Sequence, residues 1–262
     1  MYRRFAAGLQ PDDHVLTFNY DVLLERALDS VGKPFRLFPQ RFQNVRPGLA
    51  EVDTSRKEVV ILKLHGSIDW FDRAQYRERE AAFAPQGSRS RPPHPVFANT
   101  ASLDVVPLVE GPRFPTDPLR DMHRVRKLED LYRRSFLFLC TPWLLSPSSM
   151  KMLYASTLRD FWYGLGDAGA LNFDLAIIGF SLPRQDDYAR QVLYRLVTNY
   201  QTANWNKDIF GLRKRPLILV DRRHTAEELA ELRIRYAFVD WAKTQTYMSG
   251  FDDNALDLLI GT

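Results

Sequence analysis

The run from Val59 to Leu64 constrains the possible folds of this chain more than any other stretch of the sequence. Because it is apolar and rich in β-branched residues, it predicts a strand buried inside a sheet. The run ends at the pair His65-Gly66. Open α/β sheets bind ligands at the carboxyl ends of their strands, and histidine is well suited to proton transfer near neutral pH. His65 is therefore a candidate for catalysis, and the alternative is a histidine that only hydrogen-bonds its own loop.

Four more apolar runs predict buried strands, and amphipathic helical patterns separate them. Apolar strands that alternate with helices are typical of a parallel sheet with helices on both faces. We therefore expect an α/β, Rossmann-like fold, with residues 1–262 forming a single domain and the strands lying in one layer. Besides the run at 59–64, the expected strands are at residues 14–18, 135–139, 173–179 and 216–220.

Shorter patterns predict further helices and strands. Asp186 and Asp187 are expected to start a helix, and Thr225 is expected to cap another. Two weaker strands are expected at 35–38 and 236–239. The remaining helices are expected to end near Gly8 and to cover residues 22–28, 149–165 and 252–260.

Residues 72–134 differ in composition from the rest of the chain, because arginines, prolines and polar residues dominate there. Apolar residues recur about every third position from Arg120 to Arg134, which predicts a helix. A long structureless loop inside a compact domain is uncommon. We therefore expect residues 72–134 to form an inserted cap, mostly helical and otherwise irregular, beside the ligand site.

The charge and the cysteine content exclude several classes of function. The net charge is +4, with acidic residues mixed among the basic ones, so the charge favours an anionic ligand only weakly. The single cysteine, Cys140, excludes an internal disulfide and a four-cysteine zinc site. No apolar stretch approaches the ~18 residues of a bilayer span, which predicts a cytoplasmic protein. No metal-ligand spacing is found among the other histidines, which are His14, His94, His123 and His224.

Polar residues directly follow four of the predicted strands. They are Thr17–Asp21, His65–Ser67, Gly179–Ser181 and Asp221. Because strand carboxyl ends meet at one edge of a parallel sheet, the four motifs are expected to line one crevice. There Gly179 lets a ligand approach the backbone, Ser181 donates to a phosphate or a ribose hydroxyl, and Asp221 accepts from ribose hydroxyls. The alternative for Asn19 and Asp21 is the capping of the following helix.

Together these motifs resemble those of the sirtuin-like family, the NAD-binding proteins of the silent-information-regulator type. The likeness is nearer to a bacterial branch of zinc-less domains, many of which cleave NAD during antiphage defence. The motifs occur in the family's order and extend from residue 14 to about 221. They are Thr17-Phe18-Asn19-Tyr20-Asp21, Lys63-Leu64-His65-Gly66-Ser67-Ile68-Asp69-Trp70 and Ile178-Gly179-Phe180-Ser181-Leu182-Pro183, followed by Asp186 or Asp187.

The resemblance implies a hydrolase that releases nicotinamide from NAD, its substrate, without a metal. It implies that His65 is the catalytic base and that Asn19 positions water or substrate near the nicotinamide ribose. Asp21 is implied at the nicotinamide end of NAD, and Asp221 at its adenosine half. The full set that it implies for NAD binding is Thr17, Asp21, Gly66, Gly179, Ser181 and Asp221.

Two departures from the family pattern change what the resemblance implies. Phe18 takes the place of a glutamine found in protein-deacylating sirtuins, and the four-cysteine zinc module is missing, so protein deacetylation is not expected. The family begins with a strand and a Gly-Ala-Gly loop that holds the pyrophosphate at a helix N-terminus. The residues before the first predicted strand include Ala6-Ala7-Gly8 but no earlier strand and no pair of glycines. We therefore expect an N-terminally truncated or degenerate domain that binds NAD weakly.

Three functions are compatible with these observations. The first is an NAD glycohydrolase. The second is a catalytically inactive sirtuin-like module that acts through protein association, with a partner protein or as a homo-oligomer. The third is a nucleic-acid-binding domain that uses the arginine-rich residues 72–134, and it is disfavoured because runs of charge are usually solvated faces. Fold-level analogy does not choose between the first two functions.

Overall fold

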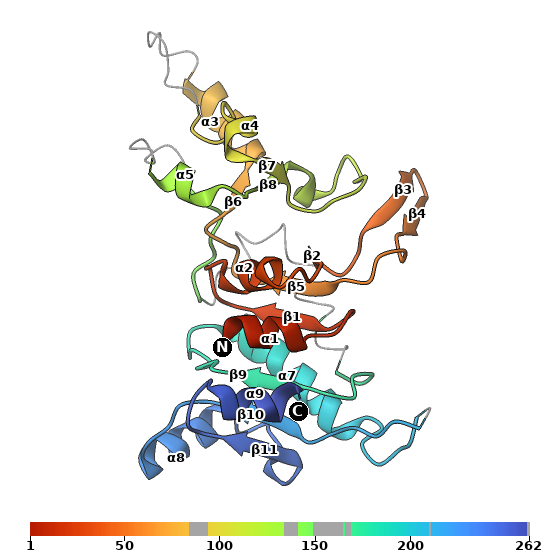
Figure 1. Ribbon diagram of the computed structural model, residues 1–262, viewed down its shortest axis with the longest axis vertical. Coiled ribbons are helices and arrows are strands. Elements are labelled where there is room, and N and C mark those ends of the chain that lie inside the picture. The colour runs from red at the N-terminus through yellow and green to blue at the C-terminus, as the bar shows by residue number, and fades with distance from the viewer. Residues whose placement is uncertain (84–93, 134–140, 149–164, 166–168, 210, 261–262) are drawn as a thin grey trace. The chain divides into compact units, whose positions relative to one another are not determined.

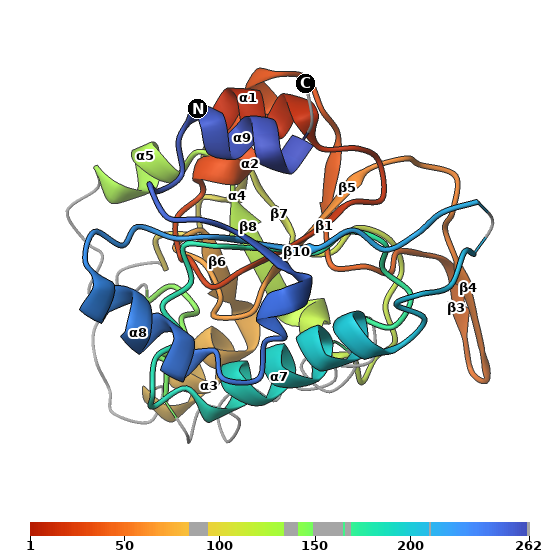
Figure 2. The ribbon, with the colours of Figure 1, turned by 90° about the horizontal axis from the view of Figure 1, so that it is seen from below.

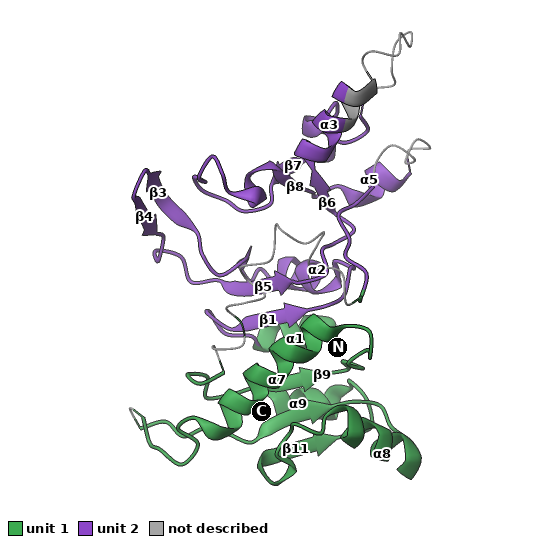
Figure 3. Cartoon of the chain, turned by 180° about the vertical axis from the view of Figure 1, so that it is seen from behind, with its two compact units in different colours: residues 1–8, 147–262 green, residues 9–146 purple. Residues whose placement is uncertain are grey.

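The computed structural model describes the chain except for residues 84–93, 134–140, 149–164, 166–168, 210 and 261–262 (Figure 1). The strand expected at 135–139, Cys140 and most of the helix expected at 149–165 lie outside the described residues. The chain forms two compact units (Figure 3). Unit 1 comprises Met1–Gly8 and Pro147–Thr262, and unit 2 comprises Leu9–Ser146.

Unit 2 contains a three-stranded parallel sheet in the order β1–β5–β2 (Figure 1). Its strands are β1 (His14–Thr17), β5 (Val59–Lys63) and β2 (Phe35–Leu37). β5 pairs on both sides and is buried along its whole length, as its apolar sequence predicts. Helix α2 (Leu23–Ser30) follows β1 and buries Ala27 and Leu28. The expected α/β class with parallel strands is thereby confirmed.

Unit 2 also contains antiparallel pairs that the sequence did not indicate. β3 (Phe42–Arg46) and β4 (Leu49–Val52) form a hairpin. A second sheet has the order β6–β8–β7, with both pairings antiparallel. Its strands are β6 (Trp70–Asp72), β8 (Met122–Val125) and β7 (Val105–Pro107), and the helical elements nearby in sequence are α3 (Arg73–Phe83), α4 (Thr100–Leu103), the 3-10 helix η2 (Pro118–Asp121) and α5 (Leu128–Tyr132).

The helix predicted from Arg120 to Arg134 is wrong for residues 122–125, which form the central strand β8. Among the described residues of the predicted stretch, only 128–132 are α-helical. β8 pairs with a strand on each side, and this tertiary hydrogen bonding overrides a local spacing that is compatible with a helix. Residues 72–134 therefore contain strands as well as helices, and their role as a cap stays a prediction.

Unit 1 is built on a three-stranded parallel sheet in the order β11–β10–β9. The strands are β9 (Ala176–Ile178), β10 (Leu217–Val220) and β11 (Thr244–Tyr247). The remaining elements are α1 (Tyr2–Gly8), α7 (Asp187–Thr202), α8 (Ala226–Arg235), the 3-10 helix η5 (Trp241–Lys243) and α9 (Asp253–Ile260).

The sheet of unit 1 is covered on both faces, as expected for a Rossmann-like arrangement. Alternate residues of β10 point to opposite faces and enter different cores. Leu217 and Leu219 belong to a core that includes residues of α7 and α8. Ile218 and Val220 belong to a second core, which includes Ala255 of α9. Helix α1 lies beside α9 (Figure 2), and Arg4 forms ion pairs with carboxylates of α9.

The capping residues of unit 1 are confirmed. Asp186 is the N-cap of α7, and its carboxylate accepts a hydrogen bond from the backbone of Ala189 at 3.0 Å. Thr225 forms a capping box with Glu228 at the start of α8. Each N-cap provides an acceptor for a backbone N–H that has no partner inside its helix.

The strand predicted at 236–239 is wrong, because these residues follow α8 as a turn. Tyr236 is buried there, and its hydroxyl donates to the carbonyl oxygen of Phe180 at 2.6 Å. The edge partner of β10 is instead β11, whose sequence Thr-Gln-Thr-Tyr is too polar to resemble a buried strand. The described parallel strands form two hydrogen-bonded sheets, one in each unit. Because the strand expected at 135–139 lies outside the described residues, the single layer of all five strands stays a prediction. No described helix combines the length and apolarity that a bilayer span requires.

Candidate functional site

Asn19 and His65 follow adjacent parallel strands of unit 2. Thr17, the last residue of β1, is in register with Lys63, the last residue of β5. The backbone N–H of Leu64 donates to the carbonyl oxygen of Thr17 at 3.1 Å, which extends the pairing beyond the strands. Both motifs therefore leave the sheet at the same edge, as the sequence predicted.

The corner between β1 and α2, residues 17–22, is ordered by short-range hydrogen bonds. Thr17 Oγ1 accepts from the backbone of Asn19 at 3.1 Å, and Asp21 Oδ1 accepts from the backbone of Leu23 at 3.0 Å. The N-cap position is Val22, whose side chain has no acceptor, so Asp21 supplies the nearest capping bond. The side chains of Thr17 and Asp21 thus have local roles, whereas Asn19 is exposed at the turn.

His65 is buried against two aromatic rings of the corner. Only 3% of its surface is exposed. The ring of Phe18 lies 4.9 Å from the imidazole, centroid to centroid, and the ring of Tyr20 is stacked at 6.1 Å. The hydroxyl of Tyr20 is itself fixed, because it donates to the carbonyl oxygen of Leu145 at 2.6 Å. The imidazole therefore packs against the same corner that carries Asn19.

Gly66 is required where a second segment approaches the backbone. Its φ is +81°, and an added Cβ would lie 2.1 Å from the carbonyl oxygen of Trp143. That oxygen accepts from the backbone of Ser67 at 3.2 Å, while the backbone of Leu145 donates to the carbonyl oxygen of His65 at 2.8 Å. Gly66 thus has a clear architectural role, and contact with a cofactor by this residue stays a prediction.

A buried ion pair beneath the corner was not identified from the sequence. Lys63 Nζ lies 2.9 Å from Glu25 Oε1, and the side chains are 0% and 3% exposed. The signal that could have revealed it was present, because a lysine in a run of buried apolar residues needs a partner of opposite charge. Burial raises the pKa of Glu25, and the nearby ammonium of Lys63 acts against this shift.

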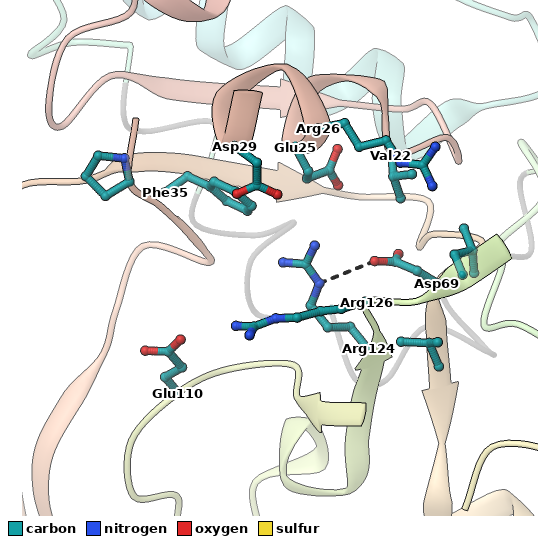
Figure 4. A pocket seen from close by; sticks show the side chains of 12 residues that line it. Val22, Glu25, Arg26, Asp29, Phe35, Asp69, Glu110, Arg124 and Arg126 are labelled. Carbon is teal, nitrogen blue, oxygen red and sulfur yellow. Dashed lines mark ion pairs between the residues drawn. The ribbon is translucent and has the colours of Figure 1, made fainter. Parts of the chain in front are cut away.

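Unit 2 also contains a cavity of about 410 Å³, which the predicted site residues do not line (Figure 4). α2 and the start of β2 form one wall, and β8 forms another. Arg124 extends into it, forms an ion pair with Asp69 at 3.3 Å and lies over the ring of Phe35. Because both carboxylates and arginines line this cavity, its lining favours neither an anion nor a cation.

Unit 1 places Gly179 and Asp221 at one edge of its own sheet. Ile178 of β9 is in register with Val220 of β10, and the N–H of Gly179 donates to the carbonyl oxygen of Val220 at 2.8 Å. Gly179 has a φ of +59°, and no described atom lies within 4 Å of an added Cβ. The space beside Gly179 is thus open among the described residues, and the approach of a ligand there stays a prediction.

Asp221 and Ser181 already have neighbours in the protein. Asp221 accepts from the backbone of Arg222 at 2.6 Å and from the guanidinium of Arg223 at 3.0 Å. Ser181 is exposed, and its carbonyl oxygen accepts from Arg235 at 3.2 Å. The structure thus assembles the predicted site in two groups, one per unit, and a crevice that joins both groups stays a prediction.

A family comparison agrees with the motifs of unit 2. Residues 13–102 match the SIR2-like domain family. The matched segment includes the corner, β5 and His65, so it supports the sirtuin-like assignment that the motifs indicated. No curated protein matches the chain. Within the described parts of the chain, no three or more His, Cys, Asp or Glu side chains are arranged to hold a metal ion.

Proposed function

We propose that this protein is a sirtuin-like NAD hydrolase that releases nicotinamide and acts in bacterial antiphage defence. The observation that carries the proposal is the placement of Asn19 and His65 at the ends of adjacent parallel strands, inside the SIR2-like segment. One side chain offers an amide that can orient water, and the other offers a base. His65 is buried, and the backbone of the exposed Asn19 is hydrogen-bonded to Thr17, so both groups are held in place, which favours a reaction between positioned groups.

The proposed hydrolysis of NAD needs only two protein groups, one that positions water and one that acts as a base. The bond between the nicotinamide nitrogen and the ribose C1′ breaks, and nicotinamide leaves with the bonding electron pair. A water molecule held by the Asn19 side chain attacks the oxocarbenium-like C1′, and its proton passes to the imidazole of His65. The products are nicotinamide, ADP-ribose and a proton. General base assistance of this kind contributes ~10²–10⁴ in rate, and it requires the neutral imidazole.

The second group of residues fits the other half of NAD. Gly179 offers an open backbone, and Ser181 offers an exposed hydroxyl. Both oxygens of the Asp221 carboxylate already accept one hydrogen bond each. An ionised carboxylate has about four lone-pair positions, so Asp221 retains acceptor capacity for a ribose hydroxyl. We propose that these residues contact the phosphates and ribose of NAD.

The test is a nicotinamide-release assay on the full-length protein with NAD, comparing wild type with Asn19→Ala and His65→Gln. Glutamine keeps much of the volume of the buried imidazole but cannot act as a base. His14→Ala serves as the control, because His14 is an exposed histidine at the start of β1. Both site variants should retain the wild-type circular dichroism spectrum and lose nicotinamide release, whereas the control should keep it. A folded wild-type protein that releases no nicotinamide would contradict the proposal and favour an inactive module that acts through protein association.

A further inference from the structure

Lys63 places an ammonium group in β5, a strand of unit 2 that is buried along its whole length. It is the last residue of β5, and its side chain is fully buried. Moving an ammonium group out of water is costly unless charged and polar partners replace the water. Residues 59–62 are apolar, and a leucine or methionine at position 63 would suit the same environment without that cost. The apolar surroundings therefore do not explain why a lysine occupies position 63.

The partners of Lys63 come from two places that flank the candidate site. Its ammonium donates to Glu25 Oε1 on α2 at 2.9 Å, and it also donates to the backbone carbonyl oxygen of Asp21. Asp21 lies two residues after Asn19, and Lys63 lies two residues before His65. One ammonium group thus links the strand that leads to the candidate base with the turn that carries the candidate amide.

Stability alone does not account for this arrangement. A buried ion pair contributes little net stability compared with apolar side chains of similar volume, since the attraction mainly offsets lost hydration. Burial raises the pKa of Glu25 and therefore opposes its ionisation even beside Lys63. An apolar pair, however, could not donate to the Asp21 carbonyl group. That bond is the feature that a lysine provides here and a leucine does not.

We infer that Lys63 and Glu25 form a positioning clamp, in which Glu25 holds the ammonium and the ammonium fixes residues 19–21 relative to His65. Its consequence for catalysis rests on the proposed function. The clamp acts together with the backbone of Ile68, which donates to the carbonyl oxygen of Tyr20 at 3.0 Å. Removing the clamp should therefore increase the mobility of residues 19–21 without freeing them completely. Lys63 and Glu25 are positioning residues and need not touch the substrate.

The experiment uses the double variant Lys63→Met/Glu25→Gln, which removes both charges and leaves no buried ion unpaired. Amide hydrogen exchange of residues 18–23 is measured in the full-length protein, together with kcat and KM for nicotinamide release. Lys214→Met is the matched control. Lys214 is a buried lysine of unit 1 that donates to the backbone carbonyl oxygens of Gly169 and Tyr200 at 3.2 and 3.0 Å.

In the double variant, exchange at residues 18–23 should rise about tenfold, while β1 and β5 stay protected. The value of kcat should fall about 10- to 100-fold with little change in KM, because misplacement of the reacting groups affects the chemical step. Lys214→Met should change neither exchange at 18–23 nor kcat. A folded double variant with wild-type exchange at 18–23, or with faster exchange and unchanged kcat, would overturn the clamp.

The inference can still be tested if wild type is inactive or if the double variant does not fold. If wild type releases no nicotinamide, the proposed function fails, and the exchange of residues 18–23 still decides whether the clamp orders the turn. If the double variant does not fold, wild-type exchange supplies the test, since a clamped turn must exchange more slowly than the exposed β3–β4 hairpin. Equal exchange of the turn and the hairpin in wild type would overturn the inference.

Discussion

Replacing Gly66 by alanine adds a single methyl group and should lower the free energy of unfolding strongly. The φ of +81° places a non-glycine residue in the left-handed region, which costs about 1–2 kcal/mol. The added Cβ would also lie 2.1 Å from the carbonyl oxygen of Trp143, so one of the two backbone segments has to move. That movement weakens the Ser67–Trp143 and Leu145–His65 hydrogen bonds, at about 1 kcal/mol each. The expected loss in the free energy of unfolding is therefore about 3–4 kcal/mol.

The assay is urea denaturation of wild type, Gly66→Ala and the control Gly32→Ala. Gly32 also has a left-handed φ, +68°, but no described atom lies within 4 Å of an added Cβ. The control should therefore lose only the conformational cost of about 1–2 kcal/mol. Equal losses for the two variants would show instead that the approach of Trp143 to Gly66 contributes nothing to the loss of stability.

Three other predictions concern stability. Asp186→Ala should cost about 1–2 kcal/mol by removing a buried N-cap of α7, measured by thermal unfolding, with the exposed Asp187→Ala as the milder control. Thr225→Ala should cost about 1 kcal/mol by opening the capping box of α8, and an unchanged Tm would contradict that role. Burial raises the pKa of Glu25, so the folded state holds this proton more tightly than the unfolded state does. Its contribution to stability is therefore largest below the ordinary glutamate pKa of 4.5 and decreases as the pH rises through the raised value; Glu25→Gln should flatten this decrease in unfolding titrations.

The elements that the sequence predicted best are those whose local signals agree with their tertiary environment. β10 is a continuous apolar run and β5 is apolar except for Lys63, and both are buried with parallel neighbours on each side. Asp186 and Thr225 stand immediately before helical patterns and form the expected caps. In these cases local propensity, hydrophobic pattern and capping chemistry all favour the same structure.

The elements that the sequence did not predict depend on distant partners. β11 is a polar strand at the edge of its sheet, and its pairing with β10 defines it rather than its own composition. β8 has a spacing compatible with a helix, and the two strands beside it decide its conformation. The approach of Trp143 to Gly66 joins segments almost 80 residues apart, so no local pattern could reveal it.

The candidate site, like the fold, was predicted where local sequence signals define it and missed where distant contacts do. The register of β1 with β5 brings Asn19 and His65 to one edge, as the ends of two apolar runs indicated. The sequence did not reveal that His65 lies against Phe18 and Tyr20. These contacts arise only when the corner folds over the end of β5, because the residues involved are more than 40 positions apart in the chain.

The most direct test of the proposed function is a product balance for NAD incubated with the full-length wild-type protein and with His65→Gln. Nicotinamide and ADP-ribose are quantified by chromatography over the same time course. We expect equal amounts of both products from wild type, and at least a 100-fold lower rate from the folded variant. Equal rates from the two proteins would contradict the assignment of His65 as the base, and no product from folded wild-type protein would contradict hydrolysis of NAD itself.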